Sequence, residues 1–168
     1  MDTYLAIASK RDWRRYADRP VPEEVSHRIL DAGRLAGSAV NRQPWTFVIV
    51  ESDEARGELA EVVYVADNVR TAGLVVAVVT AGNAPFDAGR AAQNMMLVAW
   101  SDGVVSCPNG FTDADRAAEV LGLGSEEKLV NAISFGYPAR PLDPETRSPE
   151  EWSREAKRKP LDEIVRRV

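Results

Sequence analysis

The feature that most constrains the fold is a run between residues 91 and 100 that is apolar on nearly every side. It lies within a helix predicted over residues 86–101. A helix that is hydrophobic all round is buried on more than one side. In a chain of 168 residues, such a helix is either the central helix of the fold or part of a homodimer interface, and the two interpretations are compatible. The few polar side chains of this helix form one stripe: Arg90, Gln93 and Asn94.

Apolar runs rich in β-branched residues predict three buried strands, over residues 45–50, 74–79 and 129–135. The first is expected to be a central strand, buried on both faces. A shorter strand, Val104–Cys107, precedes a predicted turn at Pro108-Asn109-Gly110-Phe111. Glycine in that turn permits a close backbone approach to a ligand.

The chain length suits one domain that buries roughly 70% of its unfolded surface. No internal repeat or second domain is apparent, so we expect a single domain over residues 1–168. Four of the ten prolines fall in residues 139–168. This C-terminal tail is expected to wrap over the domain or across a partner subunit.

Cysteine and histidine each occur once, as Cys107 and His27. That count excludes disulfide frameworks and zinc sites built from several Cys or His ligands. His27 lies off the apolar stripe of its helix and is expected to face solvent or a partner. Cys107 is expected to be a small buried hydrophobe rather than a nucleophile. No phosphate-binding Gly-Lys-Ser/Thr loop and no dinucleotide Gly-x-Gly-x-x-Gly motif is present.

Charge and hydropathy indicate the kind of partner. No basic segment followed by an apolar stretch opens the chain, and no apolar run approaches the length of a membrane span. We therefore expect a soluble, cytoplasmic protein. The net charge of -5 argues against bulk binding to nucleic acid or to anionic membranes.

Positive charge is nonetheless concentrated near both ends. Residues 10–19 hold five basic and two acidic side chains, and residues 154–167 hold six and three, so each cluster carries a net +3. Such clusters predict a small anion, for example a phosphate, held where the two ends meet. The alternative is two solvated helix faces.

The segment between Leu35 and Trp45 predicts a site rather than a spacer. Asn41 and Gln43 lie two apart, so in an extended segment their side chains face one way. Each amide both donates and accepts hydrogen bonds, which suits a flat heteroaromatic ring. The alternative is an ordinary polar loop with an aromatic plug.

Five segments, in order along the chain, form a recognisable set. They are Ser9-Lys10-Arg11-Asp12-Trp13-Arg14-Arg15-Tyr16, Pro20-Val21-Pro22, Ala36-Gly37-Ser38 with Asn41-x-Gln43-Pro44-Trp45, Asp87-x-Gly89-x-Ala91-Ala92-Gln93-Asn94-Met95, and Phe135-Gly136-Tyr137-Pro138. Together they resemble the nitroreductase-like family of FMN-dependent oxidoreductases. The resemblance implies an α+β fold in which helices flank a central mixed sheet, with the long buried helix at a homodimer interface.

The resemblance also implies an activity. One FMN would lie at each end of the dimer interface, with both subunits contributing to each site. NAD(P)H would reduce the flavin, and a nitroaromatic, a quinone or a similar small conjugated acceptor would then be reduced in a ping-pong cycle. Flavin carries this chemistry itself, so neither a catalytic side chain nor a metal is expected.

Matching the family's motifs position by position implies a set of cofactor contacts. The basic motif for the phosphate, ribityl chain and pyrimidine edge corresponds to Lys10, Arg11 and Arg14. The flavin-edge loop corresponds to Ser38, Asn41 and Gln43. A second set at the pyrimidine edge corresponds to Asn68 and Arg70. The turn near the reactive flavin nitrogen corresponds to Pro108, Asn109 and Gly110. The C-terminal phosphate contacts correspond to Arg158 and Lys159.

Two departures from the family pattern bear on function. Asp12 stands within the basic motif where the family usually has serine, so its carboxylate is expected to pair with an arginine or to accept a hydrogen bond from a ribityl hydroxyl. The segment that forms a lid over the flavin is missing or minimal. These departures keep open a flavin-binding module that stores, senses or delivers the cofactor without significant turnover. Another flavin chemistry, such as dehalogenation, or a deazaflavin donor also stays open.

Overall fold

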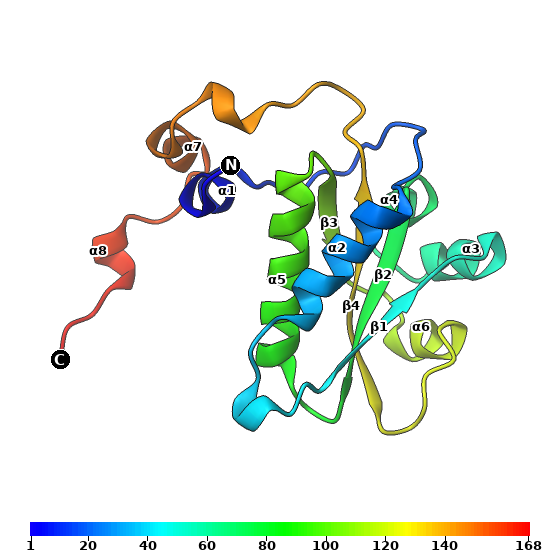
Figure 1. Ribbon diagram of the computed structural model, residues 1–168. Coiled ribbons are helices and arrows are strands. Elements are labelled where there is room, and N and C mark those ends of the chain that lie inside the picture. Colours follow the sequence, from blue (N-terminus) through cyan, green and yellow to red (C-terminus); the bar gives the residue numbers. More distant parts are fainter. The chain divides into compact units, whose positions relative to one another are not determined.

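A four-stranded sheet organises the larger part of the computed structural model, which describes residues 1–168. The strand order is β1-β2-β4-β3, and all neighbours pair antiparallel (Figure 1). The strands are β1 (Trp45–Ile49), β2 (Leu74–Ala81), β3 (Val105–Asn109) and β4 (Glu127–Gly136). The α+β class is confirmed.

The expectation of a mixed sheet is corrected, because the only parallel pairing is an isolated bridge between Asp12 and Ser106. Strand β1 also differs from expectation. It lies at an edge of the sheet and is only partly buried, with Thr46 and Ile49 exposed. Its apolar run resembles that of the central strand β2, in which Val75 to Val79 are fully buried. Apolar content therefore predicted a strand, while its direction and place in the sheet depend on tertiary pairing.

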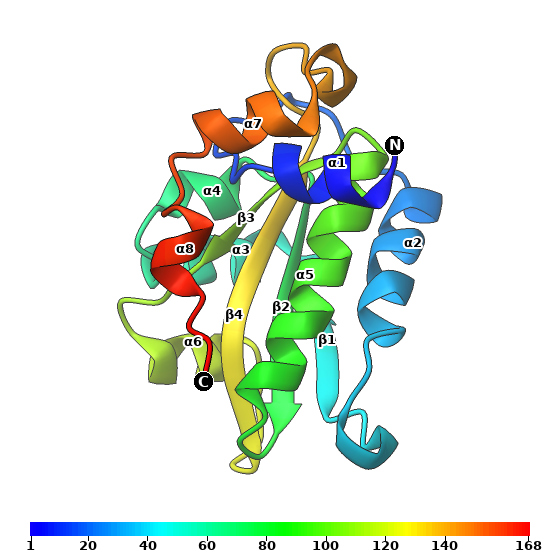
Figure 2. The same cartoon turned by 90° about the vertical axis from the view of Figure 1, so that its left-hand side faces the viewer.

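Helices cover both faces of this sheet. Helices α2 (Glu23–Arg34) and α5 (Pro85–Ser101) lie on one face, and α3 (Asp53–Glu61), α4 (Ala66–Arg70) and α6 (Ala114–Val120) lie on the other (Figures 1 and 2). The hydroxyl of Ser52 accepts a hydrogen bond from the backbone N–H of Ala55 and caps α3.

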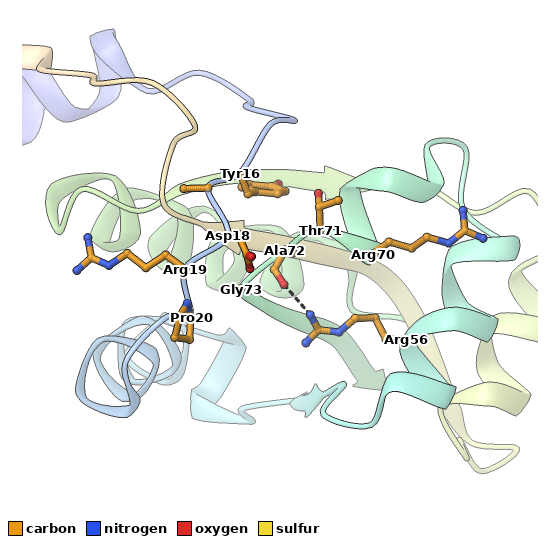
Figure 3. A pocket seen from close by; sticks show the side chains of 10 residues that line it. Tyr16, Asp18, Arg19, Pro20, Arg56, Arg70, Thr71, Ala72 and Gly73 are labelled. Atoms are coloured by element: carbon orange, nitrogen blue, oxygen red, sulfur yellow. Dashed lines mark hydrogen bonds between the residues drawn. The ribbon is translucent and has the colours of Figure 1, made fainter.

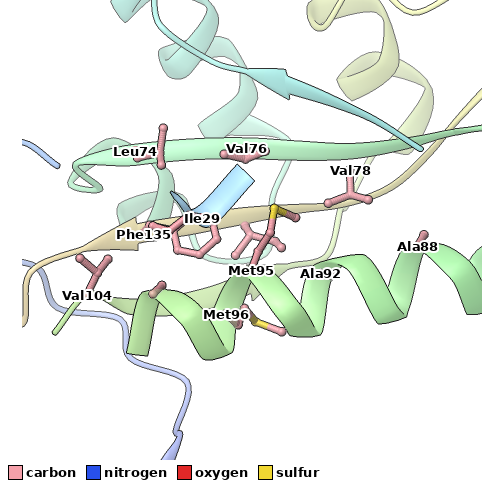
Figure 4. Packing of buried hydrophobic residues seen from close by; sticks show 12 residues of the cluster. Ile29, Leu74, Val76, Val78, Ala88, Ala92, Met95, Met96, Val104 and Phe135 are labelled. Atoms are coloured by element: carbon pink, nitrogen blue, oxygen red, sulfur yellow. The ribbon is translucent and has the colours of Figure 1, made fainter. Parts of the chain in front are cut away.

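The main core forms between α5, α2 and the sheet. Met95 of α5 packs among Ile29 of α2, Val76 of β2 and Phe135 of β4, all with no exposed surface (Figure 4). The predicted helix over 86–101 is thereby confirmed as the central helix of the fold. Its buried side chains are Asp87, Ala88, Ala91, Ala92, Met95, Met96, Ala99 and Trp100. Burial on more than one side was expected, but Leu97 and Val98 on the other side of the helix are only half-buried.

The contacts divide the chain into two compact units, and the sheet with its helices belongs to Arg11–Pro141. The other unit joins Met1–Lys10 to Leu142–Val168. It contains α1 (Thr3–Ser9), η2 (Pro144–Thr146), α7 (Pro149–Glu155) and α8 (Leu161–Ile164). Within it, the indole Nε1 of Trp152 donates to the carbonyl of Pro144 at 2.9 Å. None of the helices combines the length and the apolar character that crossing a membrane requires.

Candidate functional site

Two of the proposed cofactor residues meet inside the larger unit. Asn68 of α4 and Asn109 of β3 are almost fully buried, with 2% and 4% of their surfaces exposed. Asn68 Nδ2 donates to Asn109 Oδ1 at 2.9 Å and lies 3.6 Å from the sulfur of Cys107. Cys107 is buried, as expected. Residues 41 positions apart in the chain thus share a buried polar contact.

Strand β3 continues further than the sequence predicts. Pro108 and Asn109 are part of the strand rather than of a turn, and they pair with Ile133 and Ala132 of β4. A proline is tolerated there because β3 is an edge strand. Gly110 follows the strand, and its carbonyl accepts from the N–H of Tyr64 at 3.2 Å.

The basic segment Arg11–Tyr16 runs beside the same strand. The N–H of Trp13 donates to the carbonyl of Ser106 at 3.0 Å, and Asp12 bridges Ser106. At its far end Tyr16 bridges Pro138. The basic motif is therefore held alongside β3, the strand that ends in Pro108 and Asn109.

A cavity of about 460 Å³ opens on this segment. It is lined by Asp12, Trp13, Arg14, Arg15, Ala139 and Arg140. The guanidinium of Arg140 lies 5.1 Å from the centre of the Trp13 ring. With three arginines and one aspartate the lining is cationic, which suits a phosphate or another small anion.

A second cavity, of about 560 Å³, lies where the same segment continues (Figure 3). It is lined by Tyr16, Ala17, Asp18, Arg19, Pro20, Arg56, Arg70, Thr71, Ala72 and Gly73. Arg56 donates to the carbonyls of Ala72 and Val50 and so ties the end of β1 to the start of β2. Arg70, exposed at the end of α4, forms an ion pair with Glu61.

Tyr16 lines the second cavity and is itself largely buried. Its hydroxyl donates to the carbonyl of Ser134 at 3.4 Å. Burial, and to a lesser extent the nearby Cys107, raise the pKa of Tyr16 well above its usual value. Gly136 provides room for the ring, because a Cβ at that position would lie 2.8 Å from Tyr16 Cδ1.

The predicted flavin-edge loop has a different conformation from the expected extended one. It contains a short 3₁₀ helix, η1 (Ala39–Asn41), and its backbone is left-handed at Val40, Asn41 and Gln43, with φ of 46°, 57° and 49°. The hydroxyl of Ser38 accepts from the N–H of Gln43 at 2.8 Å. A left-handed valine costs of order 1–3 kcal/mol, and such strain concentrates at functional sites.

Within one copy of the chain this loop lies far from the asparagine pair. The carbonyl of Pro44 accepts from the N–H of Ala81 at the end of β2, whereas α4 ends at Arg70, just before β2 begins. Asn109 is level with Ala77 of β2, because both pair with Ala132 of β4. From Ala77 to Ala81 the strand rises roughly 13 Å at about 3.3 Å per residue, and the width of the sheet between β1 and β3 adds to this separation. Figure 1 shows η1 and α4 at opposite ends of the sheet.

Three proposed phosphate contacts belong to the other unit: Lys10, Arg158 and Lys159.

Two further residues at the site were not predicted from the sequence. Ser134 is fully buried. As a polar residue inside an apolar strand it could have been recognised from the sequence. Arg140 carries no comparable signal. No cluster of His, Cys, Asp or Glu side chains suitable for a metal is found in the chain.

One buried atom tests whether these residues fit a flavin. Asn68 Oδ1 is buried and meets no hydrogen-bond donor from the chain. Leaving such an acceptor unpaired is unfavourable by about 1–3 kcal/mol. The pyrimidine edge of a flavin carries one N–H between two carbonyl acceptors, so a flavin that reached this atom would supply the missing donor. The cationic cavity beside β3 suits the anionic end of FMN in the same way.

Comparison with known proteins agrees with this fold. A model of the nitroreductase family matches residues 7–81 and 66–137. A protein of Methanothermobacter thermautotrophicus, provisionally named NADH dehydrogenase/NAD(P)H nitroreductase, is 33% identical over 150 residues, which cover 83% of this chain and 78% of that protein. The chain belongs to the nitroreductase family.

Solved structures show the same architecture. A nitroreductase family protein from Clostridium difficile 630 superposes with a TM-score of 0.84 at 25% identity, covering 99% of this chain and 98% of that chain. A provisionally named nitroreductase from Desulfovibrio desulfuricans, solved in complex with FMN, superposes with a TM-score of 0.81 at 28% identity, covering 100% and 98%.

Proposed function

We propose that this protein is an FMN-dependent oxidoreductase that takes electrons from NAD(P)H and passes them to a small conjugated acceptor, such as a nitroaromatic or a quinone, by a ping-pong mechanism. When bound, FMN supplies the redox chemistry, accepting hydride from the donor and returning electrons to the acceptor. The observation that carries the proposal is the buried, unpaired acceptor of Asn68 beside the cationic segment Arg11–Arg14. The FMN-bound relative supports the choice of cofactor.

The protein's part in this activity is to bind and orient the cofactor. Arg11 and Arg14 would hold the phosphate and ribityl end. The amide of Asn68 would fix the pyrimidine edge. Arg70 would leave its ion pair with the exposed Glu61 and contact the pyrimidine edge of the flavin. A fixed cation there stabilises negative charge on the ring. The backbone from Pro108 to Gly110 would line the reactive side.

We further propose that the site is shared between two copies of the chain. Ser38, Asn41 and Gln43 lie at the opposite end of β2 from Asn68, too far to reach the same ring within one copy. In a symmetric dimer each copy supplies one set to the other's site. In this arrangement the strained loop contacts the flavin bound to the partner copy, so flavin binding requires the dimer.

The visible absorption spectrum of the purified protein tests the proposal. We expect a yellow protein whose flavin bands bleach on anaerobic addition of NADPH or NADH. A yellow protein that neither donor bleaches would favour a module that stores, senses or delivers the flavin. A colourless protein that also fails to take up added FMN would overturn the cofactor assignment.

A further inference from the structure

We infer that Asn109 is a positioning residue, which holds the amide of Asn68 in the orientation that presents Asn68 Oδ1 to the N–H of the flavin's pyrimidine edge. The inference rests on the proposed FMN site. It also changes the role of Asn109, because its buried side chain is committed to the protein rather than to the cofactor.

The amide of Asn109 has only one satisfactory orientation. Its Nδ2 lies 3.1 Å from the carbonyl of Cys107, 3.1 Å from the carbonyl of Ala132 and 2.8 Å from Ser134 Oγ. The two carbonyls accept hydrogen bonds and cannot donate them. Rotating the amide by half a turn would set Oδ1 against both of them, so Nδ2 stays on this side and Oδ1 faces α4.

That orientation determines the orientation of the next amide. Since Asn109 Oδ1 is an acceptor, Asn68 must turn its Nδ2 towards it, and the 2.9 Å contact has this sense. The Oδ1 of Asn68 is then left on the other side, buried and without a donor. The carbonyls of Cys107 and Ala132 thus set the orientation of the Asn109 amide, which sets that of the Asn68 amide. As a result the unpaired atom of Asn68 is an acceptor rather than a donor.

Ser134 shares the same face of β4. Asn109 pairs with Ala132, and residues two apart on a strand share a face, so Ser134 lies beside Asn109 on the side of the sheet that α4 covers. Asn131 belongs to the opposite face. Its Oδ1 is likewise buried without a partner. Asn131 therefore offers a matched control, an amide with the same unpaired acceptor as Asn68 but on the other face of the sheet from Asn68 and Asn109.

A double-mutant cycle tests the inference. The dissociation constant of FMN is measured by fluorescence quenching for the wild-type protein, Asn68→Leu, Asn109→Leu, the double variant and the control Asn131→Leu. We expect each single change at 68 or 109 to weaken FMN binding by about 10-fold, the value of one hydrogen bond to a buried acceptor. Asn131→Leu should change it by less than about 2-fold on the same scale.

The decisive result is the double variant. If Asn109 acts through Asn68, then Asn109→Leu adds less than about 2-fold once Asn68 is leucine. If Asn109→Leu instead has its full effect when Asn68 is already leucine, so that the two effects multiply, the inference is overturned. The proposed FMN site would still stand in that case. A wild-type protein that does not bind FMN overturns the proposed function as well, so the two failures are distinguishable.

A second measurement needs no variant and so does not depend on the folding of any. FMN methylated at N3 lacks the ring N–H, and we expect the wild-type protein to bind it about 10-fold or more weakly than FMN. Equal affinities for the two flavins would show that no buried acceptor reads this N–H, and would overturn the inference.

Discussion

Tyr16 makes stability depend on alkaline pH in a defined way. The phenol is buried, and its pKa in the folded protein is raised above the usual value of about 10. Below pH 10 the group is neutral in both the folded and the unfolded state. Above it the unfolded chain ionises first, so the stability that the neutral phenol provides is lost as pH rises from about 10 towards the folded pKa.

We therefore expect Tyr16→Phe to flatten the alkaline part of the stability profile. Between pH 10 and pH 11 the wild-type protein should lose about 1 kcal/mol more of its free energy of unfolding than the variant does. Urea unfolding at pH 8, 10 and 11 measures the difference. Parallel losses in the two proteins would mean that Tyr16 ionises as easily in the folded state as in the unfolded chain.

Arg11 should matter for the cofactor and little for the fold. Its side chain is only partly buried, and the segment that carries it is held to β3 by backbone contacts of Asp12 and Trp13. We expect Arg11→Ala to weaken FMN binding by about 10-fold to 100-fold, the range for a hydrogen bond to a charged group, with the unfolding midpoint nearly unchanged.

Arg116→Ala is the matched control for that change. Arg116 is an exposed arginine of α6, paired with Glu58 and Glu119 away from the basic segment. Its loss should leave the FMN dissociation constant unchanged, as measured by fluorescence quenching. Equal affinities of Arg11→Ala and wild type would remove Arg11 from the phosphate site.

At the scale of elements, helix α5 carries the core. Met95 has no exposed surface and packs between α2 and the sheet. We expect Met95→Ala to lower the free energy of unfolding by about 2–5 kcal/mol, because it leaves a cavity in a packed interior. Gln93→Ala, an exposed site on the same helix, should change it by less than about 0.5 kcal/mol. Urea unfolding of both variants decides whether α5 has this role.

The elements that the sequence predicted well are those whose local pattern and tertiary role agree. Strand β2 is apolar because it is buried on both faces, and helix α5 is apolar because a broad face of it is buried, so their patterns alone gave their type and nearly their bounds. Strand β1 shows the limit of this reasoning. Its apolar run predicted a central strand, yet the position of a strand depends on which partners pair with it, and no local pattern encodes that.

The candidate site shows the same limit. The asparagines and the basic segment were predicted by resemblance to known motifs, but not the way their side chains are used. Asn109 was expected in a turn at the cofactor; it lies in β3, and its amide is directed by carbonyls of two strands. The left-handed Val40 could not have been anticipated, since β-branched residues are disfavoured at positive φ.

At the scale of the whole molecule, the exposed surface near the flavin-edge loop favours a partner. Phe86, at the start of α5, has 77% of its surface exposed, and Val40 has 91%. The guanidinium of Arg90 lies 5.8 Å from the centre of the Phe86 ring, and its Nη2 would lie 2.5 Å from a Cβ at Gly37. Phe86, Arg90 and this loop therefore form one continuous surface.

Dimerisation and flavin binding should therefore be lost together. We expect the wild-type protein to sediment as a dimer in analytical ultracentrifugation. Phe86→Glu places a charge in the proposed interface, where an unpaired charge is unfavourable by several kcal/mol, so the variant should sediment as a monomer and bind FMN at least about 10-fold more weakly. A cooperative urea unfolding transition of the variant, measured at the same protein concentration as for the wild type, checks that the variant is folded. A monomeric variant that keeps the wild-type affinity for FMN would show that one copy suffices for the site, and a wild-type protein that is monomeric at every concentration would contradict the shared site itself.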